Sequence, residues 1–123
     1  MPTQSRRILV ADDNVDAAET LTVLLRGMGH EVHVALTGPA TLEQAYRLRP
    51  EIIFLDLTMP GMDGFEVAQR VKGDPALAAT RLIAMTGSGS DEDRQRTADA
   101  GFEVHLVKPV DLRFLESILG TRL

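Results

Sequence analysis

Five side chains that could carry chemistry stand at or next to the end of a short apolar run. They are the paired carboxylates Asp12 and Asp13, the carboxylate Asp56, the hydroxyl of Thr86 and the amine of Lys108. Such short apolar runs are typical of strands that are buried in a parallel sheet. Open α/β sheets bind their ligands at the carboxyl ends of these strands. If the runs pair in one sheet, the five side chains converge although they are far apart in the sequence.

This set of side chains favours phosphoryl chemistry. Crowded carboxylates raise one another's pKa unless a cation lies among them. Oxygen ligands without a histidine or cysteine favour a hard ion, and Mg²⁺ with retained waters suits one or two carboxylates plus phosphate oxygens. The amine of Lys108 and the hydroxyl of Thr86 suit the other oxygens of a phosphoryl group. We interpret the set as a phosphoryl-transfer site with a carboxylate as the acceptor.

The elements that must position these side chains follow from the apolar pattern. The run Ile52–Asp56, bounded by Pro50 and by Pro60-Gly61, favours a strand buried on both faces. Apolar runs alternate with amphipathic segments along the chain, as in βαβ units. We predict further strands at 7–11, 31–36, 81–86 and 104–107, and helices that begin after Asn14, near Pro39, and after Asp63, Ser90 and Asp111.

Five strands and five helices in strict alternation leave few right-handed topologies. The most common compact one is a flavodoxin-like, doubly wound α/β sandwich of three layers, with five parallel strands in the order 2-1-3-4-5. We expect the fourth helix to pack shallowly, because it is polar almost throughout. The last helix should turn four residues inward: Leu112, Leu115, Ile118 and Leu119.

Composition limits the possible classes of protein. A chain of 123 residues fits a single domain over 1–123, and the lack of cysteine excludes disulfides and thiolate chemistry. The net charge of −5 and the scattered basic residues argue against direct binding of nucleic acid. The first apolar run, Ile8–Ala11, is too short for a signal peptide or a membrane span. We therefore expect a cytoplasmic protein without membrane contact.

Taken together, these motifs resemble the receiver domain of the response regulators of two-component signalling, over a core of about residues 6–120. The resemblance rests on Asp12-Asp13, Asp56, the segment Met59-Pro60-Gly61-Met62-Asp63-Gly64, Thr86 and Lys108-Pro109. The segment Gly101–Asp111 is also similar to receivers attached to hybrid sensor histidine kinases. Whether the chain stands alone or belongs to a longer protein stays open.

The resemblance implies a metal-dependent phosphoacceptor. Asp56 would take a phosphoryl group from a sensor histidine kinase or a histidine phosphotransfer protein. Mg²⁺, for which Mn²⁺ is a possible substitute, would be held by the side chains of Asp13 and Asp56 and by the carbonyl of Thr58. Asp12 would act largely through a metal-bound water.

The resemblance also implies a switch and a slow reset. The Thr86 hydroxyl and Lys108 would contact the phosphoryl group, and the Lys108–Pro109 peptide would be cis. Thr58 and Ser88 would tune a slow autodephosphorylation. No external substrate would be turned over, so we expect a signalling domain rather than an enzyme.

One position departs from the family pattern. Many receivers place tyrosine or phenylalanine three residues before the lysine, and here that residue is His105. We expect His105 to move from exposed to more buried on activation, in a manner that depends on its protonation. The face formed by the fourth helix, fifth strand and fifth helix should receive a downstream protein partner. Asp91, Arg94, Arg96 and Asp99 suit that face to a charged, reversible contact, whereas His30 and His33 should be ordinary surface residues.

The motifs also admit other interpretations. An acidic pair after a strand is more often a solvated turn, and Asp63-Gly64 needs only turn chemistry. A haloacid-dehalogenase-type phosphatase would need an Asp-x-Asp pattern, but Thr58 stands at the second position after Asp56. A pseudo-receiver would typically lack one of the acidic residues or the lysine. A flavodoxin-like cofactor carrier would need a glycine-rich first loop, and Asp12-Asp13-Asn14 is acidic.

Overall fold

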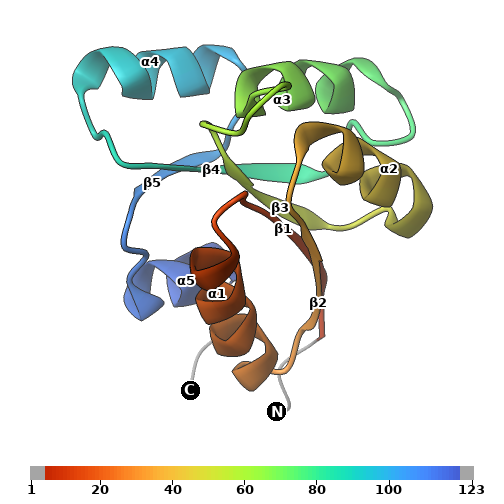
Figure 1. Cartoon of the computed structure of the whole chain (residues 1–123), viewed down its shortest axis with the longest axis vertical. Helices are drawn as coiled ribbons and strands as arrows, with labels where there is room; N and C mark the ends of the chain where they lie inside the picture. The colour runs from red at the N-terminus through yellow and green to blue at the C-terminus, as the bar shows by residue number, and fades with distance from the viewer. Residues whose placement is uncertain (1–4, 120–123) are drawn as a thin grey trace.

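The computed structural model describes residues 5–119 as strands and helices that alternate along the chain (Figure 1). The strands are β1 (Arg7–Ala11), β2 (Glu31–Ala35), β3 (Ile52–Asp56), β4 (Arg81–Thr86) and β5 (Val104–Val107). The helices are α1 (Val15–Gly27), α2 (Gly38–Leu48), α3 (Gly64–Gly73), α4 (Asp91–Asp99) and α5 (Leu112–Leu119). Each predicted element is present, and the predicted strands differ from these bounds only in that β2 ends one residue earlier.

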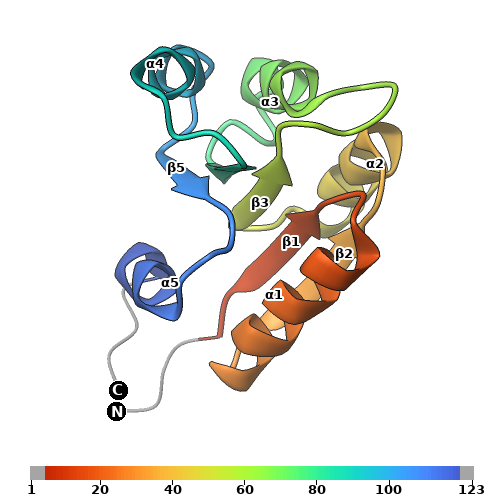
Figure 2. The ribbon, with the colours of Figure 1, turned by 60° about the vertical axis from the view of Figure 1, so that its left-hand side comes forward.

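The five strands form one parallel sheet in the order β2-β1-β3-β4-β5, which confirms the predicted doubly wound topology. Helices α1 and α5 cover one face of the sheet, and α2, α3 and α4 cover the other (Figure 2). Because all strands run in the same direction, their carboxyl ends lie together. We call this side of the sheet the carboxyl edge and the opposite side the amino edge.

The core explains why β3 lies in the middle of the sheet. Ile53 and Leu55 pack in the cluster under α2 and α3, whereas Ile52 and Phe54 pack in the cluster under α1 and α5. All four side chains are fully buried, since strand side chains alternate between two covered faces. Burial of one such side chain contributes about 1.5–3 kcal/mol. The last residue of β3, Asp56, is therefore held in place by the most deeply buried strand.

Predicted caps begin three of the helices. The side chains of Asn14, Asp63 and Ser90 accept backbone N–H bonds of 3.1, 3.0 and 3.1 Å from residues three positions later. These bonds satisfy amide groups that have no partner within the helix. The last helix differs from its prediction, because Leu112 lies in the first turn of α5 and is 41% exposed. Helix α4 packs shallowly as predicted, and Thr97 is its one buried residue.

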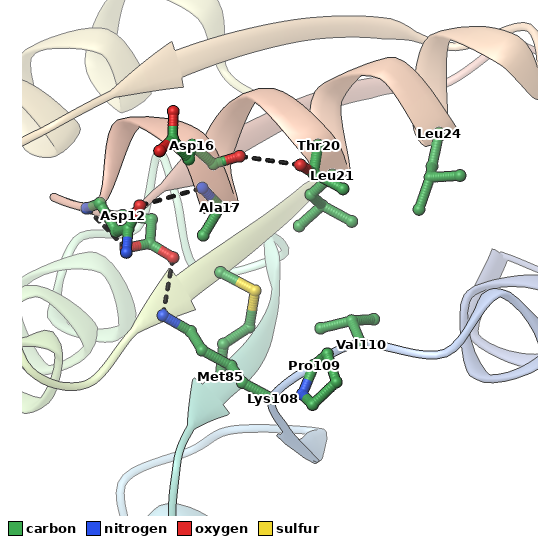
Figure 3. Close-up of a pocket in the computed structure, with 11 residues that line it drawn as sticks. Asp12, Asp16, Ala17, Thr20, Leu21, Leu24, Met85, Lys108, Pro109 and Val110 are labelled. Carbon is green, nitrogen blue, oxygen red and sulfur yellow. Dashed lines mark hydrogen bonds and ion pairs between the residues drawn. The ribbon is translucent and has the colours of Figure 1, made fainter.

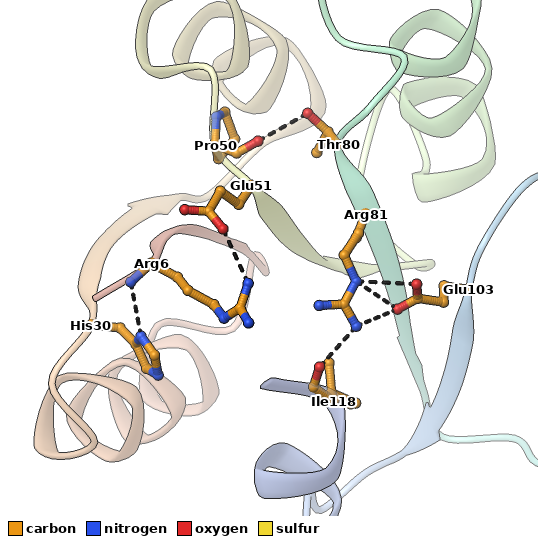
Figure 4. Close-up of polar contacts among 8 residues, drawn as sticks. All are labelled: Arg6, His30, Pro50, Glu51, Thr80, Arg81, Glu103 and Ile118. Carbon is orange, nitrogen blue, oxygen red and sulfur yellow. Dashed lines mark hydrogen bonds and ion pairs between the residues drawn. The ribbon is translucent and has the colours of Figure 1, made fainter. Parts of the chain in front are cut away.

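Paired charges line the amino edge (Figure 4). Arg6 pairs with Glu51 at 3.1 Å, and Arg81 pairs with Glu103 at 2.6 Å and also donates to the Ile118 carbonyl of α5 at 2.8 Å. Across residues 5–119, none of the helices combines the length and the apolar character needed to cross a membrane.

His30 corrects the prediction that it is a surface residue, since it is only 6% exposed. Its Nδ1 accepts a 3.1 Å bond from the Arg6 amide, which draws the ring under the start of β1. Burial, and then the charge of Arg6, lower the pKa of the ring. His33 on the edge strand β2 is half-buried and bonds the Glu31 carboxylate at 2.9 Å.

Candidate phosphoacceptor site

Sheet pairing brings the predicted residues to one place. Asp56 ends β3, Thr86 ends β4, and Asp12 and Lys108 come directly after β1 and β5. Backbone bonds continue the sheet past its formal ends, from the Asp12 amide to the Ala35 carbonyl (3.1 Å) and from the Lys108 amide to the Thr86 carbonyl (2.8 Å). The backbone of the site is therefore fixed by the sheet itself.

Lys108 joins two of the carboxylates. Its Nζ lies 2.8 Å from Oδ2 of Asp12 and 3.3 Å from Oδ2 of Asp56. Both carboxylates are buried, at 1% and 5% exposed, whereas Asp13 is exposed. One ligand oxygen from each of Asp12, Asp13 and Asp56 lies within 4.8 Å of the others. The Lys108 ammonium therefore pairs with two buried carboxylates, and a third, exposed carboxylate lies beside them on the carboxyl edge.

The electrostatics of the site follow from this crowding. Burial raises the pKa of Asp56 to about 6, and the neighbouring Asp12 adds to the rise. A bond of 2.9 Å from the Thr58 amide to Oδ1 of Asp56 and the charge of Lys108 oppose the rise. Burial also disfavours the Lys108 ammonium, but the bond to Asp12 and the charge of Asp56 outweigh it and raise the pKa of Lys108.

The donor set fits a hard divalent cation. All of its donors are carboxylate oxygens, and burial and then the neighbouring Asp12 raise the pKa of Asp56, a cost that a dication would offset. Asp12 already bonds Lys108 and the Asn14 amide, the latter at 2.9 Å, whereas Asp13 is open to solvent. The Thr58 amide bonds Asp56, and the role of the Thr58 carbonyl stays a prediction.

Thr86 is buried, and its hydroxyl oxygen accepts a bond of 3.2 Å from the Ser88 amide. Within residues 5–119, no hydrogen bond joins this hydroxyl to Asp56. Ser88 also offers its carbonyl to His105, whose ring is half-buried. This corrects the expectation of an exposed ring in the unphosphorylated chain, because contacts with the β4–α4 loop and α4 draw the ring inward.

Gly64 does more than form a turn, because it also allows a close approach between two backbone segments. A Cβ at this position would lie 2.6 Å from the Asp56 carbonyl oxygen and 2.8 Å from Cα of Leu57. Real Cβ atoms do not approach backbone so closely, so only glycine lets α3 start against the backbone of Asp56 and Leu57. The clash partner lies eight residues away in the chain, which is why the local sequence did not reveal it.

A cleft of about 500 Å³ opens beside the carboxylates, between the start of α1 and the segment after β5 (Figure 3). Lys108 reaches across one end of it to Asp12. Leu21, Leu24 and Val110 supply much of its apolar wall. The Lys108–Pro109 peptide on its rim is cis, as expected. The site therefore adjoins an apolar groove.

Comparisons with known proteins identify the family. The model of the response regulator receiver domain matches residues 8–119. The response regulator PleD of Caulobacter vibrioides is 38% identical over 107 residues, which are 87% of this chain and 24% of that protein. The DNA-binding response regulator MtrA of Mycobacterium tuberculosis is 33% identical over 123 residues, 100% of this chain and 53% of that protein. The chain thus spans about a quarter to a half of the length of these relatives.

Solved structures agree in fold. The chemotaxis protein CheY4 of Vibrio cholerae matches with a TM-score of 0.88 and 28% identity, over 95% of this chain and 98% of that one. The receiver domain of the sensor histidine kinase PA1611 from Pseudomonas aeruginosa matches with a TM-score of 0.85 and 26% identity, over 94% and 95%. That structure holds a magnesium ion in its active-site cleft. By its sequence match and its fold, this chain belongs to the response regulator receiver domain family.

Proposed function

We propose that this chain is a phosphoacceptor that takes a phosphoryl group onto Asp56 from a phosphohistidine. The donor would be a sensor histidine kinase or a histidine phosphotransfer protein. The observation that carries this proposal is the Lys108 ammonium held between Asp12 and Asp56 at the carboxyl edge. We assign a single receiver domain to 1–123 with a core of about 6–120. Residues 1–4 and 120–123 of that assignment lie outside the described residues.

The metal would be held by the side chains of Asp13 and Asp56, with the Thr58 carbonyl as a third ligand and Asp12 behind a bound water. When present, Mg²⁺ or Mn²⁺ supplies positive charge that offsets the carboxylates and the incoming phosphoryl oxygens. The magnesium ion in the cleft of the PA1611 receiver supports this assignment. The crowding of Asp12, Asp13 and Asp56 supports it independently.

Transfer would use the chain's own residues in a defined order. With its pKa at about 6, Asp56 is mostly ionised near neutral pH, so its carboxylate oxygen can attack phosphorus. The P–N bond of the phosphohistidine breaks, and the imidazole leaves with that electron pair and takes up a proton. The Lys108 ammonium turns from the carboxylates to a phosphoryl oxygen, and the Thr86 hydroxyl donates to another. Hydrolysis then resets the site, and Thr58 and Ser88 flank the approaching water.

Two surfaces would serve the partners. The donor would dock on α1, whose start lines the cleft and where Val15 is 56% and Val23 is 63% exposed. A downstream protein would use the face of α4, β5 and α5, where Phe114 is 59% exposed. The guanidinium of Arg96 lies 4.3 Å from the ring centre of Phe65 on α3. Arg96 therefore does not join the charged contact expected on the face of α4, β5 and α5.

Labelling with acetyl phosphate tests the function. Intact mass should show one added phosphoryl group only when Mg²⁺ or Mn²⁺ is present, and Asp56→Asn should remove it. The exposed carboxylate Asp99 on α4 offers a matched control, so Asp99→Asn should label like the parent. Unchanged labelling of Asp56→Asn would remove Asp56 from its role.

A further inference from the structure

The ring of His105 joins three elements. Its Nε2 lies 2.8 Å from the carbonyl oxygen of Ser88 in the β4–α4 loop, and its Nδ1 lies 3.0 Å from the hydroxyl of Thr97 on α4. His105 itself belongs to β5. Thr97 is buried, so water can replace the His105 ring as the partner of its hydroxyl only if α4 moves.

The number of protons in this network depends on the charge of the ring. The Ser88 carbonyl can only accept, so Nε2 must carry a proton. The Thr97 hydroxyl also lies 2.9 Å from the Arg94 carbonyl, and its one proton cannot serve both that carbonyl and Nδ1. A neutral ring therefore leaves one of these contacts without a proton. A ring protonated on both nitrogens satisfies all three contacts at once, and its bonds are charge-assisted.

The charged groups around the ring come from α4. Arg94 donates through Nε to the Gly89 carbonyl at 3.1 Å, so it holds the same loop one residue further along. Bonds from the hydroxyls of Ser88 and Ser90, and then the charges of Arg96 and His105, lower the pKa of Asp93. The residues of β4 beside His105 are uncharged, and the Lys108 ammonium is held by the carboxylates. Asp93 therefore balances part of the positive charge near the ring.

We propose that His105 is a positioning residue whose second proton tightens the hold on Ser88, so that phosphorylation of Asp56 responds to pH through His105. This inference rests on the proposed phosphoacceptor function. Ser88 links the two sites, because its carbonyl contacts the ring while its amide donates to the Thr86 hydroxyl oxygen at 3.2 Å. A stronger or weaker bond between His105 and the Ser88 carbonyl therefore shifts the Thr86 hydroxyl, which would contact the phosphoryl group.

The geometry also sets the direction of the response. In the switch that the receiver resemblance implies, the β4–α4 loop moves toward the phosphoryl group and the ring at position 105 turns inward. The ring already takes an inward position here, and protonation strengthens both contacts that keep it there. Protonated His105 thus favours the arrangement that accepts the phosphoryl group.

The test compares rates of labelling by acetyl phosphate in the parent and in His105→Gln across the range in which histidine titrates. Glutamine keeps an N–H donor for Ser88 but does not titrate. The ratio of the parent rate to the variant rate should rise about threefold from about pH 8 to about pH 6. Asp56 titrates in both proteins, so its effect cancels in the ratio. A ratio that is flat or falls over this range overturns the proposal.

Two further variants sharpen the comparison. Thr97→Val keeps the shape of the side chain but removes the hydroxyl beside Nδ1, so it should abolish most of the threefold rise. His33→Gln replaces a half-buried histidine on β2, far from the loop, and its ratio to the parent should stay constant with pH.

A measurement without phosphoryl donor separates the two proposals. In the parent, the NMR amide signals of Ser88 and Gly89 should shift with pH together with the His105 ring, and in His105→Gln they should not. If these signals do not follow the ring, the inference fails even though Asp56 is labelled. If the parent is not labelled at any pH with Mg²⁺ present, the proposed function itself fails.

Discussion

At the amino edge, three arginines each have a glutamate partner, whereas at the carboxyl edge three carboxylates lie around one ammonium that pairs with two of them. The pairs are Arg6–Glu51, Arg7–Glu31 and Arg81–Glu103, all of them partly exposed. Asp12 and Asp56 are buried, and within residues 5–119 only Lys108 pairs with them both. One sheet thus ends in balanced charge on one side and in excess negative charge on the other.

This difference separates charges that are already paired from buried carboxylates that outnumber their partner. Exposed ion pairs contribute about 0–1 kcal/mol each, so the amino edge is close to neutral in energy. Burial disfavours an ionised carboxylate until a cation or proton joins it, and the neighbouring Asp12 adds to this effect, so the pKa of Asp56 is raised. The carboxyl edge is therefore least stable in the state that is ready to bind a cation.

Removing the shared ammonium should produce the largest loss of stability. Lys108→Ala leaves Asp12 and Asp56 buried without their partner, and we expect the free energy of unfolding to fall by about 2–3 kcal/mol without divalent cations. Urea unfolding measures this. Arg6→Ala at the amino edge breaks an exposed pair and should cost less than about 1 kcal/mol. Equal losses in the two variants would contradict the contrast between the edges.

Neutralising Asp56 should raise the free energy of unfolding instead of lowering it. Asp56→Asn removes a crowded charge, so we expect it to stabilise the chain by about 1–2 kcal/mol at about pH 7.5 without metal, after allowance for solvent screening. The pKa of Asp56 is raised from 3.8 to about 6, so the stability it contributes is fully present below 3.8 and is lost as pH rises through about 6.

The advantage of Asp56→Asn should therefore be small in acid and grow with pH through about 6. Unfolding titrations of both proteins at several pH values measure the difference. A difference that is constant with pH would mean that the variant acts through packing rather than through charge.

The carboxyl edge was predictable from the sequence because its residues are tied to strand ends. The apolar run Ile52–Asp56 specifies a central strand, and parallel pairing then carries Asp12, Thr86 and Lys108 to the same edge. Likewise, the caps at Asn14, Asp63 and Ser90 act over three residues and are visible locally. Short-range patterns and the direction of the strands were sufficient for this part of the molecule.

Contacts that depend on how a helix is rotated were not predictable. Helix α4 is polar on nearly every side, so its sequence does not show that Thr97 faces β5 or that Arg96 stacks on Phe65. The burial of His30 depends on the Arg6 amide, 24 residues away. These contacts join elements whose relative placement no local pattern describes.

Metal binding should distinguish carboxylates within the carboxyl edge. Asp12 already bonds Lys108 and the Asn14 amide, whereas Asp13 is exposed. We therefore expect Asp13→Asn to weaken Mg²⁺ binding about tenfold, or about 1.4 kcal/mol, and Asp12→Asn to weaken it less, by about threefold. Calorimetric titration with Mg²⁺ gives both values. A larger loss in Asp12→Asn would reverse the proposed direct and water-mediated roles.

The smallest effect should come from the one uncompensated group of the amino edge, His30. Its Nδ1 accepts from the Arg6 amide, and its buried Nε2 has no hydrogen-bond partner among residues 5–119. Burial, followed by Arg6, lowers the pKa of His30 below its ordinary 6.5. The stability that this ring contributes is therefore present above 6.5 and is lost as pH falls through its lowered value.

Asp56 titrates in the opposite sense in an overlapping range, so the effect of His30 should be measured in the Asp56→Asn background. There, unfolding free energy should fall by less than about 1 kcal/mol from about pH 7 to about pH 5, and the added change His30→Gln should remove part of that fall. Glutamine can still accept from the Arg6 amide but does not titrate, so the comparison isolates the proton on the ring. An identical fall in both proteins would assign the acid sensitivity to other groups and leave the amino edge balanced throughout.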